Sequence, residues 1–186
     1  MEAFLVSTGL VSLAEVGDKT QLLSLVLAAR FRKPWPIVAG IFAATLLNHS
    51  LAGAFGAWIT GMMGPTTLTR LLGASFLLMA AWILVPDEID EEGTAQRAVG
   101  GVFWTTTVLF FLAEIGDKTQ VATVVLAARY EALVQVILGT TLGMLVANVP
   151  VVMFGEAIAR RLPVAIVRKV TAAAFAVLGV GVLVTA

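Results

Sequence analysis

The chain has 186 residues, of which 59% are hydrophobic and 13% are charged, and its mean hydropathy is +0.97. Soluble domains carry about 25% charged residues, so this composition excludes an ordinary soluble globule and predicts an all-α membrane protein. Twelve basic residues balance twelve acidic ones, which argues against a nucleic-acid partner, and the absence of cysteine excludes disulfides and thiolate metal sites.

Six apolar stretches are long enough to cross a bilayer as helices, since a span needs about 20 apolar residues. In chain order they are Phe4–Ala29, Pro36–Thr60, Leu68–Val85, Val102–Ala128, Ala132–Ile158 and Val164–Thr185. The first stretch follows Met1 and Glu2 and has ionisable residues in its middle, so we do not expect a cleavable signal peptide. The connections are short, and the distinctly polar one contains the acidic run Asp87–Glu92.

The chain contains an internal repeat. LAEVGDKTQLLSLVLAAR at residues 13–30 and LAEIGDKTQVATVVLAAR at residues 112–129 are identical at 13 of 18 positions, at an offset of 99 residues. The same offset relates Gly40 to Gly139 and Phe76 to Phe175. We therefore predict two three-helix repeats, 1–85 and 101–186, joined by an acidic cytoplasmic linker at 86–100. Because three spans carry the chain to the opposite side, the second repeat must have inverted topology, as in many secondary transporters.

The basic residues predict the orientation in the membrane. Eight of them fall on the side of the first, third and fifth connections: Arg30, Arg32, Lys33, Arg97, Arg160, Arg161, Arg168 and Lys169. The opposite side has only Arg70 and Arg129. Since cytoplasmic loops carry the excess of lysine and arginine, we expect the odd-numbered connections in the cytoplasm and both termini outside.

Charged residues lie in the middle of the first and fourth predicted spans. Three of them recur at the repeat offset: Glu15, Asp18 and Lys19, then Glu114, Asp117 and Lys118. Each ion at a helix centre costs roughly 2.5–3.5 kcal/mol to insert, so four carboxylates facing lipid would cost on the order of 10 kcal/mol. We expect them instead to face one another, because the pseudo-two-fold axis of an inverted repeat would bring both motifs together near the middle of the membrane.

Neighbouring residues extend this candidate site. On one continuous helix, Asp18 and Lys19 would share a face with Glu15, three and four residues away. Gly17 and Gly116 each cost about 1 kcal/mol relative to alanine inside a helix, which indicates close helix packing or a broken helix with free carbonyl groups. Further residues expected to support the site or line the path are Lys19, Lys118, Thr20, Thr119, Gln21, Gln120, Asn48 and Asn148.

The ligands expected from these residues are all oxygen atoms. Oxygen ligands favour calcium, manganese or magnesium ions, whereas zinc and copper favour nitrogen and sulfur. Clustered carboxylates repel one another, so an empty site should bind protons and an incoming cation should expel them. That exchange is the physical basis of a cation/proton antiporter, which needs no permanently bound cofactor.

The doubled Glu-x-Gly-Asp-Lys-Thr motif, in six short apolar spans, resembles the calcium:proton antiporter-2 family, also called uncharacterised protein family sixteen. That family includes Golgi and bacterial manganese and calcium transporters and belongs to the wider lysine-exporter superfamily. The resemblance covers essentially the whole chain. It implies a transporter and not an enzyme, which exports Mn²⁺ or Ca²⁺ from the cytoplasm in exchange for protons. It also implies that Glu15, Asp18, Glu114 and Asp117 are metal ligands and that the chain resides in a bacterial inner membrane.

Alternative interpretations of the motif remain open. Glu15 with Lys19 and Glu114 with Lys118 can form structural ion pairs, although two carboxylates would then be left over. The chain can also transport another cation, such as a basic amino acid, or form a structural membrane bundle without transport. An intramembrane aspartic protease fits less well, because it needs two aspartates without an adjacent glutamate and lysine.

Three further features have two interpretations each. His49 can act as a proton relay or ligand, but its repeat counterpart is Asn148, which favours a satisfied polar group beside the site. The run Asp87–Glu92 is either a solvated linker or a cation-collecting segment. The sequence leaves the oligomeric state open, between a monomer and a homo-oligomer.

Overall fold

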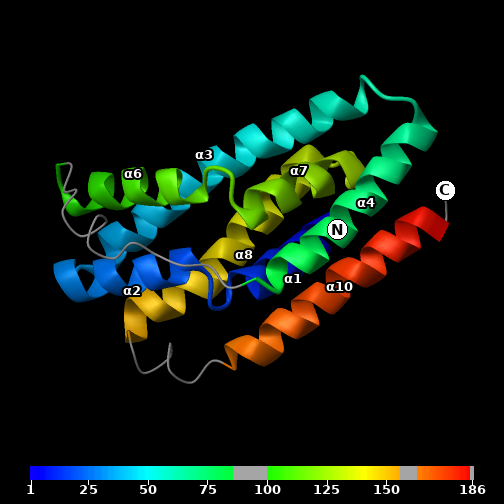
Figure 1. Cartoon of the computed structure of the whole chain (residues 1–186). Helices are drawn as coiled ribbons and strands as arrows, with labels where there is room; N and C mark the ends of the chain where they lie inside the picture. Colours follow the sequence, from blue (N-terminus) through cyan, green and yellow to red (C-terminus); the bar gives the residue numbers. More distant parts are fainter. Residues whose placement is uncertain (86–99, 156–162, 185–186) are drawn as a thin grey trace.

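The computed structural model describes residues 1–85, 100–155 and 163–184, and all regular elements in these ranges are helices (Figure 1). In chain order the helices are α1 (Glu2–Glu15), α2 (Lys19–Phe31), α3 (Pro34–Thr60), α4 (Pro65–Ile83), α6 (Val102–Glu114), α7 (Lys118–Tyr130), α8 (Leu133–Phe154) and α10 (Val164–Val184). The acidic run 87–92 lies outside the described residues, as do Arg97, Arg160 and Arg161. The all-helical prediction is confirmed for the described ranges.

Four of the described helices are long and apolar enough to cross a membrane, namely α3, α4, α8 and α10. They correspond to the second, third, fifth and sixth predicted spans. The first and fourth predicted spans are each divided into two shorter helices, α1 with α2 and α6 with α7. Six complete spans and their inverted arrangement therefore stay predictions.

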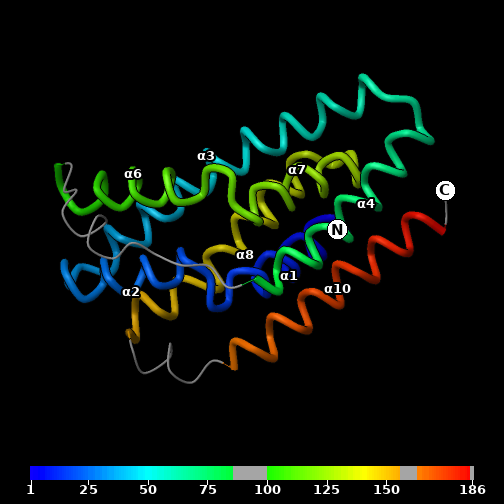
Figure 2. Tube along the Cα trace, viewed as in Figure 1, coloured from blue at the N-terminus to red at the C-terminus, as the bar shows by residue number. Residues whose placement is uncertain are grey.

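The two divided spans are interrupted inside the repeated motif, near the middle of the molecule (Figure 2). Gly17 and Gly116 have φ angles of +79° and +73°, which a residue without a Cβ atom adopts readily. Asp18 and Asp117 follow in extended conformation as the N-cap residues of α2 and α7. The broken helix is thus confirmed as the consequence of the motif glycine. The expectation that Glu15 and Asp18 share one helix face is wrong, because the helix ends between them.

Helices of the two halves pack against each other at positions related by the repeat offset. α1 lies against α8, and its counterpart α6 lies against α3. Glycines permit the close approach: a Cβ atom on Gly139 would lie 2.6 Å from the Phe4 carbonyl oxygen, and one on Gly40 would lie 2.8 Å from that of Phe103. Close contact through small residues is how membrane helices associate without a hydrophobic driving force between them.

Helices α4 and α10, which the repeat offset also relates, pack side by side (Figure 1). Phe76 and Phe175, which the repeat offset relates, are buried at their interface with ring centroids 6.1 Å apart. The pair also packs on α1 and α7. As a result Val164, the first residue of α10, contacts the interruption between α1 and α2, where a Cβ atom on Gly17 would lie 2.2 Å from Val164 Cγ1.

Candidate cation site

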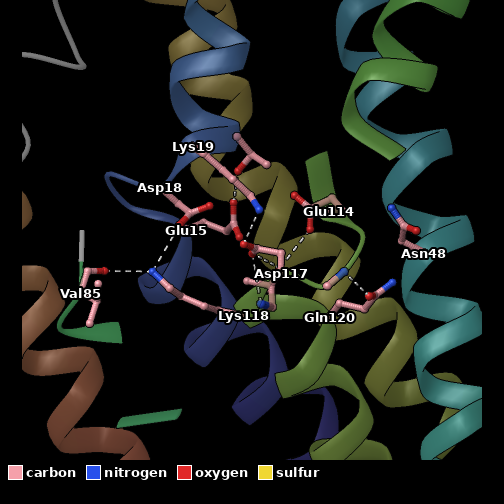
Figure 3. Close-up of polar contacts among 12 residues, drawn as sticks. Glu15, Asp18, Lys19, Asn48, Val85, Glu114, Asp117, Lys118 and Gln120 are labelled. Carbon is pink, nitrogen blue, oxygen red and sulfur yellow. Dashed lines mark hydrogen bonds and ion pairs between the residues drawn. The ribbon is translucent and has the colours of Figure 1, made fainter. Parts of the chain in front are cut away.

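Three of the four predicted acidic ligands converge where the two interrupted helices meet (Figure 3). Glu15 is the last residue of α1, Glu114 is the last residue of α6, and Asp117 precedes α7. Each contributes one carboxylate oxygen to a group whose members all lie within 4.8 Å of one another. Both glutamates are fully buried, and Asp117 is 2% exposed. Two halves of the chain thus form one acidic cluster.

The helix ends add to the negative potential of this cluster. Glu15 and Glu114 stand at the C-terminal ends of α1 and α6, where the helix dipole places partial negative charge. A carboxylate at such an end is unfavourable without a cation nearby. Ends of interrupted helices bind the transported cations in several secondary transporters, so this geometry is suited to holding a positive ion.

Threonine hydroxyls orient the acidic side chains. The Thr20 hydroxyl donates to Glu15 Oε2, and the Thr119 hydroxyl lies 3.0 Å from Glu114 Oε2 and 3.3 Å from Asp117 Oδ2. Among the described residues, the other glutamate oxygens, Glu15 Oε1 and Glu114 Oε1, are buried without a hydrogen-bond partner. Burying a polar atom without a partner costs free energy, and a bound cation would remove that cost.

The two motif lysines form ion pairs across the repeats (Figure 3). Lys19 Nζ lies 2.8 Å from Asp117 Oδ1, and Lys118 Nζ lies 3.9 Å from Asp18 Oδ1. The interpretation that each lysine pairs with the glutamate of its own motif is therefore wrong. The interruption carries the lysine away from the preceding glutamate and toward the opposite motif.

Asp18, the fourth predicted ligand, lies beside the cluster of three and not within it. It lines a small polar pocket of about 10 Å³ together with Gly17, Lys118 and Arg168. Lys118 Nζ also donates to the backbone carbonyl of Val85 at 3.2 Å. Sequence reasoning missed Arg168 and Val85, because only the packing of α4 and α10 brings these two positions to the motif.

The two motif glutamines, expected to support the site, stabilise the two helix interruptions. Gln21 Oε1 accepts a hydrogen bond from the Gly17 amide at 2.9 Å, and Gln120 Oε1 accepts one from the Gly116 amide at 2.8 Å. Gln21 Nε2 donates to the Ala147 carbonyl at 3.1 Å. In this conformation both amide oxygens accept hydrogen bonds from backbone N–H groups, so they are not available as cation ligands. The glutamines instead fix the backbone at the interruptions, next to the acids.

The polar residues of α3 and α8 lie at helix contacts near the motif. Asn148 Oδ1 accepts a hydrogen bond from Ser24 at 2.8 Å, and Asn48 Nδ2 donates to the Phe111 carbonyl at 3.2 Å. His49 is fully buried, and within the described ranges neither ring nitrogen has a hydrogen-bond partner. The expectation that protein groups satisfy His49 is therefore wrong.

Comparison with known proteins identifies the family. The family model for the divalent cation/proton antiporter GDT1 matches residues 3–91 and 102–186, which cover both predicted repeats. The chain belongs to the GDT1 family. A GDT1 relative from Vibrio cholerae, provisionally named a manganese exporter, is 53% identical over 177 residues, covering 94% of this chain and 87% of the relative.

More distant GDT1 relatives also align with most of the chain. A GDT1-like protein of Synechocystis is 29% identical over 180 residues, covering 87% of each chain. GDT1-like protein 4 of Oryza sativa subsp. indica is 28% identical over 167 residues, covering 76% of this chain and 59% of the relative. No solved structure matches the chain. As a GDT1 member with four candidate spans in its described part, the chain is a membrane transporter of divalent cations, from a family of antiporters.

Proposed function

We propose that this GDT1 member exports Mn²⁺ from the cytoplasm in exchange for protons, with Ca²⁺ as the alternative cargo. The observation that carries the proposal is the buried group of Glu15, Glu114 and Asp117, whose carboxylate oxygens come from both halves of the chain and lie within 4.8 Å of one another. Carboxylate oxygens suit Mn²⁺ and Ca²⁺. The relative named for manganese export supports Mn²⁺ as the cargo.

The charge of the two motifs fits a divalent cation. Their four acids and two lysines leave a formal charge of −2, which one divalent cation would neutralise inside an apolar bundle. In the proposed mechanism, Glu15, Glu114 and Asp117 hold the cation, and Thr20 and Thr119 orient the glutamates. Asp18 lies beside this group, in the pocket that Lys118 and Arg168 also line.

Proton exchange follows from repulsion among the acids. When the cation leaves, three buried carboxylates remain within 4.8 Å of one another, and protonation relieves their repulsion. An incoming cation then displaces those protons from the same oxygens. The motif lysines, each paired with an aspartate of the other half, keep part of the charge balanced in both states.

The pocket that described residues line beside Asp18 suits a metal ion better than a basic amino acid. The pocket beside Asp18 measures about 10 Å³, and a single water needs about 10–15 Å³ of such volume. An amino-acid substrate would need a far larger cavity than this pocket.

We further propose six spans in two inverted repeats, with the odd-numbered connections in the cytoplasm of a bacterial cell and both termini outside.

The test is transport by the purified protein in liposomes, with one dye reporting internal Mn²⁺ and another reporting internal pH. Wild type should move Mn²⁺ and protons in opposite directions, and Ca²⁺ should compete with Mn²⁺ if both are cargo. Glu114→Gln and Asp117→Asn keep size and hydrogen bonding but remove charge, so both fluxes should disappear together. Glu131→Gln, at the exposed end of α7, is the matched control and should transport normally. Normal Mn²⁺ flux in Glu114→Gln and Asp117→Asn would refute the shared carboxylate site.

A further inference from the structure

A groove runs between α1 and α10 on the apolar surface of the bundle, and none of its lining residues is charged. Its volume is about 520 Å³, and its walls include Leu5, Gly9 and Leu13 of α1 with Ala174 and Val177 of α10. A Cβ atom built on Gly9 meets no other atom within 4 Å. The small residues therefore leave a shallow, open apolar channel between α1 and α10, which pack against each other.

At one end this groove continues into a second hollow of about 360 Å³. The two share Val177 and Leu178, and the second adds Glu2, Arg129 and Tyr130. The Tyr130 hydroxyl donates to Glu2 Oε1 at 3.5 Å, and the Arg129 guanidinium lies over the Tyr130 ring, 5.7 Å from its centroid. An apolar channel thus leads to one cationic, one anionic and one hydroxyl group.

The length of this combined channel matches one leaflet of a bilayer. It follows α10 from Ala173 to Val182, which is ten residues separated by nine steps of 1.5 Å, or about 14 Å. Half of the hydrocarbon core measures about 15 Å. Tyrosine and arginine at a helix end are typical of the membrane interface, and Arg129 and Tyr130 are the last two residues of α7. The charged end therefore lies where a lipid headgroup would be.

We propose that the channel binds one phosphatidylethanolamine molecule, with an acyl chain between α1 and α10, its phosphate at Arg129 and its ammonium group at Glu2. Charges of both signs in the headgroup hollow match a zwitterionic lipid. The primary ammonium of ethanolamine can donate hydrogen bonds to a carboxylate, whereas the quaternary ammonium of choline has no N–H group. An anionic glycerol headgroup would offer Glu2 no cation.

Native mass spectrometry of the detergent-purified protein tests this assignment. The probes are palmitoyl-oleoyl phosphatidylethanolamine, phosphatidylcholine and phosphatidylglycerol, which share their acyl chains and differ in headgroup. One phosphatidylethanolamine should remain bound in preference to the other two. Arg129→Gln should lower its affinity about tenfold, the effect of losing one charge-assisted hydrogen bond. Arg70→Gln removes an exposed arginine of α4 that lies outside the channel, so it should change nothing.

A second variant tests the acyl-chain part. Gly9→Leu places a side chain in open space, so it should fill the groove and displace the lipid without unfolding the protein. Ala54→Leu, on the exposed surface of α3, is the control for added apolar volume. Equal binding of the three lipids, or preferential binding of phosphatidylglycerol, would overturn the headgroup assignment. Unchanged phosphatidylethanolamine binding in both Arg129→Gln and Gly9→Leu would show that the lipid binds elsewhere on the apolar surface. That result would overturn the proposed binding site.

Discussion

Alanine in place of Gly17 should destabilise the protein more than alanine in place of Gly116, although the two glycines occupy equivalent positions. Both have φ near +75°, with values of +79° and +73°. Their surroundings differ, because a Cβ atom on Gly17 would lie 2.2 Å from Val164 Cγ1, whereas one on Gly116 meets nothing within 4 Å. Gly116→Ala therefore measures backbone strain alone, and Gly17→Ala adds a steric clash with α10.

The expected magnitudes follow from these two contributions. A left-handed conformation costs a non-glycine residue roughly 1–2 kcal/mol, which is the loss of unfolding free energy expected for Gly116→Ala. Overpacking adds about 1–3 kcal/mol, so Gly17→Ala should lose about 2–5 kcal/mol in total. Val164→Ala removes both clashing methyl groups, and combining it with Gly17→Ala should recover the overpacking part.

The assay is SDS titration of the purified protein in mixed micelles, with unfolding followed by the fluorescence of its four tryptophans. The free energy of unfolding is compared among wild type, the two glycine variants, Val164→Ala and the double variant, so that a double-mutant cycle isolates the coupling between positions 17 and 164. Equal losses for the two glycine variants, or a coupling free energy of zero, would refute the packing of α10 on the interruption.

Three further outcomes are expected. Thr119→Val should raise the Mn²⁺ concentration for half-maximal transport about tenfold or more, because hydrogen bonds to charged groups contribute roughly 1.5–3 kcal/mol. Transport kinetics in liposomes measure this concentration, and an unchanged value would contradict the orienting role of the hydroxyl. His49→Asn copies the residue at the equivalent position of the second half and should retain substantial Mn²⁺ flux, so an inactive variant would instead assign His49 to the transport path. Reporter fusions at residues 32 and 165 should be active in the cytoplasm and a C-terminal fusion outside it, and the reverse pattern would overturn both the proposed topology and the direction of transport.

The elements of this fold follow from the sequence because hydropathy and repetition act locally. Apolar stretches of about 20 residues satisfy the backbone only as helices, and the described helices begin and end close to the predicted spans. The helix interruption can also be predicted from the sequence. Gly17 and Gly116 are unfavourable inside a helix, and both lie beside acids that cannot face lipid.

The partners of those acids depend on tertiary packing, so the motif alone does not specify them. Spacing along a continuous helix pairs Glu15 with Lys19, but the interruption redirects Lys19 to Asp117, 98 positions away in the sequence. Arg168 reaches the pocket beside Asp18 only because α10 packs on α1. No local sequence pattern distinguishes Arg168 from an arginine at a membrane surface. The sequence therefore predicts only a surface position for it.

The exchange of lysines between the two halves constrains how the protein is made. Lys19 and Asp18 acquire their partners Asp117 and Lys118 only after nearly 100 more residues have been added to the chain. At about 5–20 residues per second, the ribosome needs roughly 5–20 s to supply them. During that interval the first interrupted segment carries three charges that hydrocarbon disfavours. It must therefore wait in the insertion machinery or at the membrane surface, and the first half cannot complete its burial until the second half emerges.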